Sequence, residues 1–237
     1  MKLSAPIHVL KQQAKALSRQ ENIRLHAALD RIAAREGFKA WSHLAARWQP
    51  ESPGAALFAQ LQPGDLVLVG SRPGQGKTLL AIGLAIEAMQ QRQHAALFTM
   101  EFTAADVARC FGQLGHELAD FGARFVLDLS ERISAEHIAT RLADAPPRTL
   151  AVIDYLQLLD QPREHPPLDQ QVRTLKAFAQ ARQAIVVCLS QIRRDYEAAG
   201  RPCPDLDDVR LPNPVDLSLF SKACFLHNGK MQLLMGS

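Results

Sequence analysis

No apolar run in this 237-residue sequence approaches the roughly 20 residues that a membrane-spanning helix requires. The first residues, MKLSAPIHVLKQQAKAL, lack both a long apolar core and a small-residue cleavage site, so we expect no secretory leader. The sequence has only four cysteines, and their wide separation gives no metal-binding spacing. From these absences we expect a protein without a membrane span or a cysteine-bound metal, in a reduced, cytoplasmic setting. The cysteines are Cys110, Cys188, Cys203 and Cys224.

Acidic residues are scarce in one part of the chain. Residues 1–48 contain nine basic and three acidic residues, a net charge of +6, whereas the whole chain carries +3. Such a basic arm favours an anionic partner such as nucleic acid. A solvated helical face explains the same charges equally well, and both interpretations are open. The basic residues of this arm are Lys2, Lys11, Lys15, Arg19, Arg24, Arg31, Arg35, Lys39 and Arg47.

Hydrophobic periodicity divides the chain into two parts. Helical spacing predicts three helices within a small basic unit at 1–48, a linker at 49–54 contains two prolines and a glycine, and an α/β domain follows at 55–237. Apolar strands alternate with helices in that domain, which predicts a mostly parallel sheet flanked by helices. The tail reads as a β-hairpin around Asn228-Gly229. Expected strands are 66–70, 95–100, 124–127, 149–154 and 184–190; expected helices are 77–92, 103–116, 134–144 and 168–183.

A glycine-containing loop lies between the first apolar strand and the helix after it. Its sequence is Ser71-Arg72-Pro73-Gly74-Gln75-Gly76-Lys77-Thr78. Such a loop directs backbone N–H groups at one spot, where the helix dipole also favours an anion. Lys77 can reach the terminal phosphates of a nucleotide, and the Thr78 hydroxyl can ligate Mg²⁺. Although the general pattern has Gly where this chain has Ser71, we predict a phosphate-binding loop rather than a simple turn between core elements.

Three further strands end in polar side chains. Because the carboxyl ends of parallel strands meet on the ligand side of a sheet, Asp154 could hold Mg²⁺ and Glu101 could deprotonate an attacking water. Glu101 would lie near the phosphate loop if its strand neighbours the strand before that loop. Gln191 could hydrogen-bond a γ-phosphate and change position on hydrolysis. Each carboxylate also has a structural alternative: Asp154 as a loop or cap residue, and Glu101 as the cap of the helix near Thr103.

A polar loop at 193–216 directly follows Gln191. Its basic residues make it a candidate for contacts with DNA phosphates. They are Arg193, Arg194, Arg201 and Arg210. Acidic residues in the same loop dilute that interpretation, so a solvated loop remains the alternative. Among them are Asp195, Glu197, Asp205, Asp207 and Asp208.

The ordered motif set resembles the C-terminal ATPase domain of replicative DnaB-type helicases. It consists of Arg72-Pro73-x-x-Gly76-Lys77-Thr78, Met100-Glu101, Val152-Ile153-Asp154-Tyr155-Leu156-Gln157-Leu158 and Leu189-Ser190-Gln191-Ile192-x-Arg194. The resemblance covers roughly residues 55–228, and the family often has a small residue other than Gly at the position of Ser71. It implies a RecA-like P-loop core, Mg-ATP as ligand, and a ring of subunits acting on single-stranded DNA.

By motif position, the resemblance assigns a role to each site residue. Lys77 and Thr78 would bind phosphate and Mg²⁺, Glu101 would be the catalytic base, Asp154 the acid on the Mg²⁺ side, and Gln191 the γ-phosphate sensor. The predicted function is therefore a DnaB-like helicase-type ATPase that couples Mg-ATP hydrolysis to DNA.

The chain departs from the family in two respects. The basic unit differs from the family's large N-terminal helical domain, and no arginine follows Arg210, although the family has a Lys-x-Arg arginine finger on a late strand. Lys222 and Lys230 are candidates to act in trans. The alternative function is a slow or non-hydrolysing nucleotide switch that regulates a partner, and a recombinase- or clock-type RecA relative shares the same core.

Overall fold

The computed structural model describes residues 4–5, 7–21, 23–47, 52–160, 166–211 and 213–235. Internal contacts divide the chain into two compact units, Met1–Ser52 and Pro53–Ser237. Half of the predicted linker at 49–54, residues 49–51, lies outside the described residues. Its last two residues, Pro53 and Gly54, begin a helix instead of a linker (α4, Pro53–Phe58). Proline suits the first turn of a helix, and a Cβ on Gly54 would lie 2.6 Å from the Gly83 carbonyl carbon, so this glycine is required by helix packing.

The described part of the first unit contains three helices. They are α1 (Ile7–Gln20), α2 (Leu25–Arg35) and α3 (Trp41–Arg47). The core of the unit contains one apolar stripe from each of the first two helices, with Leu10 and Ala14 packed against Ala28 and Ile32. Small alanines allow α1 and α2 to approach closely, and the charged residues remain on the surface.

The second unit contains a seven-stranded sheet with the strand order β3-β2-β4-β5-β1-β6-β7. The strands β1 to β6 all run parallel to one another, and β7 pairs antiparallel with β6 at one edge. This arrangement confirms the predicted mostly parallel α/β fold with a C-terminal hairpin. The strands are β1 (Leu66–Ser71), β2 (Ala95–Thr99), β3 (Phe125–Asp128), β4 (Leu150–Asp154), β5 (Ile185–Gln191), β6 (Lys222–His227) and β7 (Lys230–Met235).

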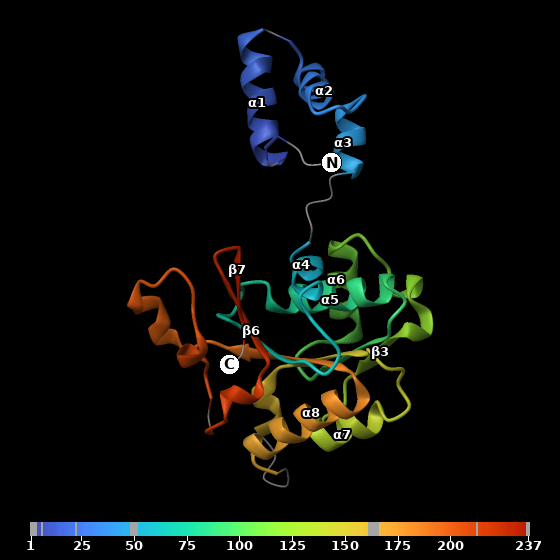
Figure 1. Ribbon diagram of the computed structural model, residues 1–237, viewed down its shortest axis with the longest axis vertical. Coiled ribbons are helices and arrows are strands. Elements are labelled where there is room, and N and C mark those ends of the chain that lie inside the picture. The colour runs from blue at the N-terminus through green and yellow to red at the C-terminus, as the bar shows by residue number, and fades with distance from the viewer. Residues whose placement is uncertain are drawn as a thin grey trace. The chain divides into compact units, whose positions relative to one another are not determined.

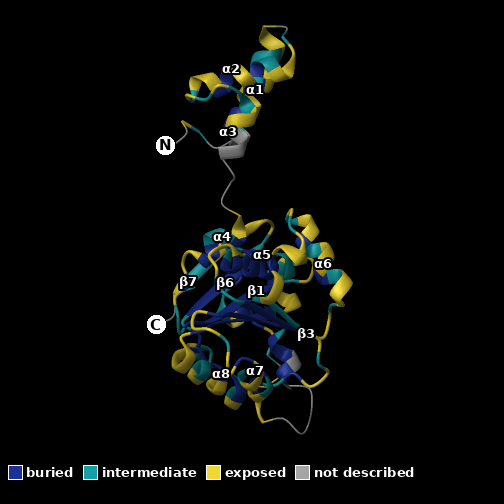
Figure 2. Ribbon diagram, turned by 90° about the vertical axis from the view of Figure 1, so that its right-hand side faces the viewer, coloured by how far each residue is buried: buried dark blue, intermediate teal, exposed yellow. Residues whose placement is uncertain are grey.

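Helices cover both faces of the sheet (Figure 1). One face packs against α4, α5 (Lys77–Gln90) and α6 (Ala104–Gln113), and the other against α7 (Ala135–Arg141) and α8 (Leu168–Arg182). Consecutive strand residues serve the two layers in turn: Val67 and Val69 belong to the first, and Leu66 and Leu68 to the second. Because both faces are covered, the strands β1, β2, β4 and β5 are buried along nearly their whole length, and Figure 2 shows the sheet as the dark centre of the unit.

The expected strands agree with the observed ones to within one residue at each end. The helices differ more, because α6 and α7 stop three residues before their predicted ends. Among the described residues, no helix has the length and apolarity that spanning a membrane would take. Short 3₁₀ helices fill the connections, at Leu118–Asp120, Gly122–Arg124, Leu156–Asp160, Arg194–Ala199, Leu206–Asp208 and Leu217–Leu219.

Candidate functional site

The predicted phosphate loop links β1 to α5 at the carboxyl edge of the sheet. Gly74 and Gly76 adopt φ values of +77° and +84°, which only glycine tolerates without strain. Gly76 is also the N-cap of α5 and supplies no side chain to cap that helix. The N-terminal N–H groups of α5 are therefore not capped by the residue that precedes them, and a bound anion would complete the helix end.

The irregular start of this loop has a packing explanation. A Cβ on Gly70 would lie 2.8 Å from the Phe225 ring of β6, so glycine is required one position before the pattern expects it. Ser71 is fully buried and pairs in register with Gln191 of β5, as a strand residue does. The serine therefore belongs to the end of β1, and the loop proper begins at Arg72.

Asp154 lies at the end of β4 and is 1% exposed. The Thr78 hydroxyl donates a hydrogen bond to its Oδ2 at 3.3 Å, whereas its Oδ1 has no partner among the described residues. Burial raises the pKa of Asp154 to about 6; the nearby Lys77 ammonium lowers it and the Glu101 carboxylate raises it further. An unpaired buried carboxylate is costly, and a divalent cation at this position would satisfy it.

Glu101 is near Asp154 for a different reason than the one expected. Its strand, β2, is separated from β1 by β4 and β5, so the condition that the two strands are neighbours is not met. Glu101 approaches the site because β2 is adjacent to β4, and Thr99 is in register with Asp154. The alternative role of Glu101 as a helix cap is wrong. Thr103 is the N-cap of α6 and forms a capping box with Asp106, so the exposed Glu101 carboxylate is not used there.

Gln191 ends β5, and its position is fixed by residues from the following loop. The Arg210 guanidinium donates to Gln191 Oε1 at 3.4 Å, and the Arg210 N–H donates to the Gln191 carbonyl at 2.8 Å. The buried Gln157 amide donates to Ser190 Oγ at 2.9 Å and also to the Arg210 carbonyl. The sequence pointed to Gln157 only as part of the Asp-Tyr-Leu-Gln-Leu motif and to Arg210 only as one of the loop arginines, and it did not predict that either residue would fix the end of β5.

Other predicted residues lie in other environments. Arg201 is bound by Asp205 and by the buried Asp208, so its charge is used within the loop. Arg193 lies 3.6 Å from the Asp195 carboxylate, and Arg194 is exposed. The prediction of DNA contacts therefore depends on Arg193 and Arg194 more than on Arg201.

The two lysines considered as trans-acting residues differ sharply. Lys222 is buried and forms an ion pair with Asp65 at the amino edge of the sheet, so its charge is used within the chain. Lys230 is exposed in the β6–β7 hairpin. The hairpin turn contacts the phosphate loop, since the Asn228 N–H donates to Gln75 Oε1 at 2.8 Å.

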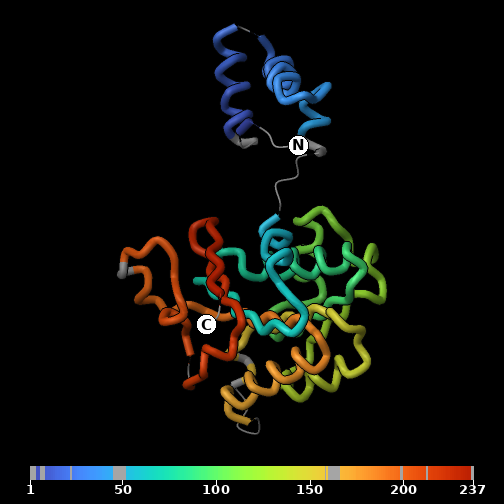
Figure 3. Tube along the Cα trace, viewed as in Figure 1, coloured from blue at the N-terminus to red at the C-terminus, as the bar shows by residue number. Residues whose placement is uncertain are grey.

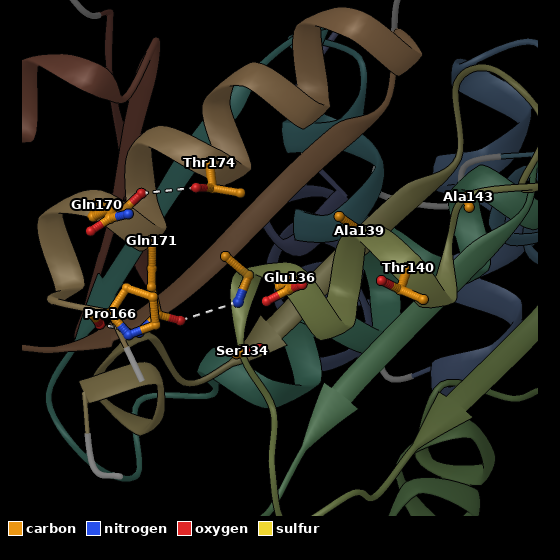
Figure 4. Close-up of a pocket in the computed structure, with 10 residues that line it drawn as sticks. Ser134, Glu136, Ala139, Thr140, Ala143, Pro166, Gln170, Gln171 and Thr174 are labelled. Atoms are coloured by element: carbon orange, nitrogen blue, oxygen red, sulfur yellow. Dashed lines mark hydrogen bonds between the residues drawn. The ribbon is translucent and has the colours of Figure 1, made fainter. Parts of the chain in front are cut away.

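A cavity of about 560 Å³ lies between α7 and α8 (Figure 4). Gln171 Oε1 accepts a hydrogen bond from the Ala135 N–H at its edge, and Thr174 and Glu136 also line it. These helices cover the face of the sheet opposite α5, and the lining contains none of the predicted site residues. In the described part of the chain, no group of three or more His, Cys, Asp or Glu side chains could hold a metal by itself.

Known proteins that are similar to this chain in sequence are replicative helicases. The family described as the DnaB-like helicase C terminal domain matches residues 56–115 and 117–215. A probable plasmid replicative DNA helicase of Chlamydia muridarum is 26% identical over 181 residues, which are 63% of this chain and 40% of that protein. The chain thus corresponds to less than half of the length of this relative.

Two solved structures have a similar fold. One is a separate ATPase domain, which gives a TM-score of 0.56 at 20% identity, and the match covers 71% of both chains. A DnaB-like replicative helicase, solved to describe its interactions with primase, gives a TM-score of 0.61 at 15% identity and covers 98% of this chain and 70% of that one. Since the family match extends over more than half of the residues, the chain belongs to the DnaB-like helicase C-terminal domain family, with the RecA-like fold of its ATPase domains.

Proposed function

We propose that the α/β unit binds Mg-ATP at the carboxyl edge of its sheet and couples ATP hydrolysis to single-stranded DNA. The observation that carries this proposal is the buried Asp154 carboxylate, hydrogen-bonded to Thr78 at the start of α5 and unpaired at its other oxygen. A carboxylate and a hydroxyl from these two elements are the donor set that Mg²⁺ takes in phosphoryl-transfer sites. The unpaired oxygen therefore fits the ion that the family implies.

Each residue of the site has a distinct task in this proposal. Thr78 and Asp154 would hold Mg²⁺, which when bound neutralises phosphate charge. Lys77 and the loop from Ser71 to Thr78 bind the phosphates, with the amide groups at the start of α5 as donors. Glu101 is exposed beside Asp154 and accepts the proton of the attacking water. Gln191 hydrogen-bonds the γ-phosphate and reports its loss to the loop beyond β5.

Coupling to DNA is proposed from the relatives. The similar proteins carry the name replicative DNA helicase, and this chain corresponds to about 40% of the length of such a relative. We infer that exposed Arg193 and Arg194 contact the phosphates of single-stranded DNA, and that several copies assemble in a ring around it. Light scattering with Mg-ATP tests assembly, because a monomeric mass under those conditions would contradict the ring.

The three-helix unit is proposed to add DNA or partner contacts. All of the basic side chains described between Lys11 and Lys39 are exposed, and the 14 residues of α1 contain no acidic residue. Lys11, Lys15 and Arg19 follow each other at four-residue spacing and so share one face of α1. Removing residues 1–52 is expected to weaken binding to DNA at low salt, and an unchanged dissociation constant would contradict this role.

A slow nucleotide switch is the second candidate function. The observation that favours it is the burial of Lys222 in an ion pair with Asp65. A lysine held in this way is a poor candidate for a trans-acting finger, which leaves Lys230 of the two lysines considered. Loss of such a finger lowers turnover by about 10³–10⁵ in related systems.

ATPase assays with and without single-stranded DNA distinguish the two candidates. We expect DNA to stimulate turnover to at least about 1 s⁻¹, a typical enzyme rate. Lys77→Ala should abolish ATP binding or turnover, and Glu101→Gln should retain bound ATP while slowing its hydrolysis. Lys176→Ala and Glu136→Gln are controls away from the site and should behave as wild type. Normal turnover in Lys77→Ala would contradict the site, and DNA-independent slow turnover in the wild type would favour the switch.

A further inference from the structure

The chain after Gln191 leaves the sheet and then returns to the same strand end, along the orange part of Figure 3. We call residues 192–210 the return segment. Its two ends pair with each other: Ile192 and Val209 form an antiparallel bridge, and the Arg193 N–H donates to the Asp208 carbonyl at 2.9 Å. Arg210 then hydrogen-bonds Gln191 itself. The predicted sensor and the predicted DNA-contacting arginines therefore belong to one continuous hydrogen-bonded structure.

The return segment is internally cross-linked. The Tyr196 hydroxyl donates to the Arg201 carbonyl at 2.7 Å, and its ring is buried under the Arg201 guanidinium. The same guanidinium is bound by Asp205 and Asp208. These contacts join the 3₁₀ helix Arg194–Ala199 to residues 201–208, which lead to Arg210. A displacement of that helix would therefore also displace the end of the segment at Arg210.

The Arg72 side chain connects this segment to the phosphate loop. Its Nε donates to Glu197 Oε1 at 2.9 Å, and its Nη1 donates to the Ile192 carbonyl at 3.0 Å. The Arg72 side chain is 17% exposed, whereas that of Glu197 is 61% exposed. An exposed ion pair alone contributes little, but a mostly buried guanidinium with two acceptors is held in a defined position. Arg72 thus belongs to the phosphate loop by its backbone and to the return segment by its side chain.

We propose that Arg72 is a positioning residue that transmits the nucleotide state of the phosphate loop to the return segment through Glu197 and the Ile192 carbonyl. This inference rests on the proposed function of the site. Phosphates that engage the loop alter the backbone that carries Arg72. Because Glu197 lies in the same 3₁₀ helix as Arg194, the arginines that face DNA shift with it. Coupling of this kind between two sites changes an affinity about 5- to 150-fold in general.

The test measures the affinity of the full chain for labelled oligo-dT, with Mg²⁺ and a non-hydrolysable ATP analogue and without nucleotide. In the wild type we expect the two dissociation constants to differ about tenfold, within the usual range of coupling. Glu197→Gln should reduce that ratio to below about threefold while the affinity for the analogue stays near the wild-type value. The charge exchange Arg72→Glu with Glu197→Arg should restore part of the ratio, and Arg72→Glu alone should not. Asp207→Asn, an exposed acid in the same segment, is the matched control.

Hydrogen exchange of the return segment gives a readout independent of DNA. The analogue should slow exchange of amides in residues 192–210 in the wild type and in Asp207→Asn, but much less in Glu197→Gln. A wild type that binds the analogue while its DNA affinity and its exchange in this segment stay unchanged overturns this inference alone. So does a Glu197→Gln variant that keeps the full ratio. A wild type that binds no nucleotide overturns both the proposed function and this inference.

Discussion

Two buried aspartates at opposite edges of the same sheet have opposite surroundings. Asp65 precedes β1 at the amino edge and is bound by the Lys222 ammonium, by the Gln62 N–H at 2.7 Å and by the Ser221 hydroxyl at 2.8 Å. Asp154 ends β4 at the carboxyl edge and receives one long hydrogen bond from Thr78. Burial by itself raises the pKa of Asp65, but its hydrogen bonds and Lys222 lower it below the ordinary value, whereas burial raises the pKa of Asp154 to about 6.

The two edges of the sheet differ in how far a buried carboxylate is compensated by its neighbours. At the amino edge the buried Asp65 carboxylate is paired with Lys222, and this ion pair joins the start of β1 to the start of β6. At the carboxyl edge a carboxylate is buried without full compensation, which lowers stability until a ligand arrives. A fold tolerates such a group where binding compensates for it. The amino edge should therefore respond to mutation through stability, and the carboxyl edge through ligand binding.

The largest expected effect on stability is at the amino edge. Lys222→Met removes the cation and leaves the Asp65 carboxylate buried and unpaired, which should lower the free energy of unfolding by about 4 kcal/mol. Urea denaturation measures this loss. The double variant with Asp65→Asn should recover most of it, because the unpaired charge is then gone. A loss below about 1 kcal/mol, the usual contribution of an exposed ion pair, would show that this pair does not stabilise the amino edge of the sheet.

A somewhat smaller effect of opposite sign is expected at the carboxyl edge. The folded-state pKa of Asp154, about 6, lies above its ordinary value of 3.8, so its stability contribution is complete below pH 3.8 and is lost as pH rises through 6. Without Mg²⁺ and nucleotide at pH 7.5, Asp154→Asn should unfold at a higher urea concentration than the wild type. Its free energy of unfolding should be about 3 kcal/mol larger, because a pKa difference of about two units corresponds to that free energy.

The control for Asp154 is the same comparison at lower pH. At pH 4.5 the wild-type carboxyl group is largely protonated when folded, and the advantage of Asp154→Asn should shrink. Equal stability of the two proteins at every pH would mean that the buried carboxylate carries no penalty.

The smallest effect concerns the acid limb at Asp65. Its folded-state pKa lies below the ordinary value, so its contribution is present above that value and is lost as pH falls through the folded pKa. Urea denaturation between pH 5 and pH 2.5 should show a shallower loss of stability in Asp65→Asn than in the wild type. If the free energy of unfolding fell with pH in parallel in the two proteins, Asp65 would not contribute to the loss of stability in acid.

Local sequence was sufficient for the parts of the site that are contiguous or lie at strand ends. The loop from Ser71 to Thr78 carries its glycines, lysine and threonine within eight residues, and strand ends in a parallel sheet meet at one edge by geometry alone. Asp154 and Gln191 could therefore be predicted without knowledge of strand order. The structure brings these residues to the same edge as the phosphate loop.

Contacts between distant segments could not be predicted in the same way. The strand order, which separates β2 from β1, is set by packing of the whole sheet. Arg72 and Glu197 are 125 residues apart, and Lys222 and Asp65 are 157 residues apart, so neither pair leaves a local signal. The need for glycine at position 70 leaves no local signal, because the Phe225 ring that requires it comes from a strand near the other end of the chain.

The central claim is that the edge containing Asp154 is a magnesium-nucleotide site. Calorimetric titration of the wild type and of Asp154→Asn with ATP, in Mg²⁺ and in EDTA, tests it directly. We expect the wild type to bind ATP at least about tenfold more tightly with Mg²⁺ than without. Asp154→Asn should lose most of this dependence while remaining folded, since Asp154 and Thr78 would hold the ion. Absence of ATP binding by the wild type, or equal Mg²⁺ dependence in the two proteins, would contradict it.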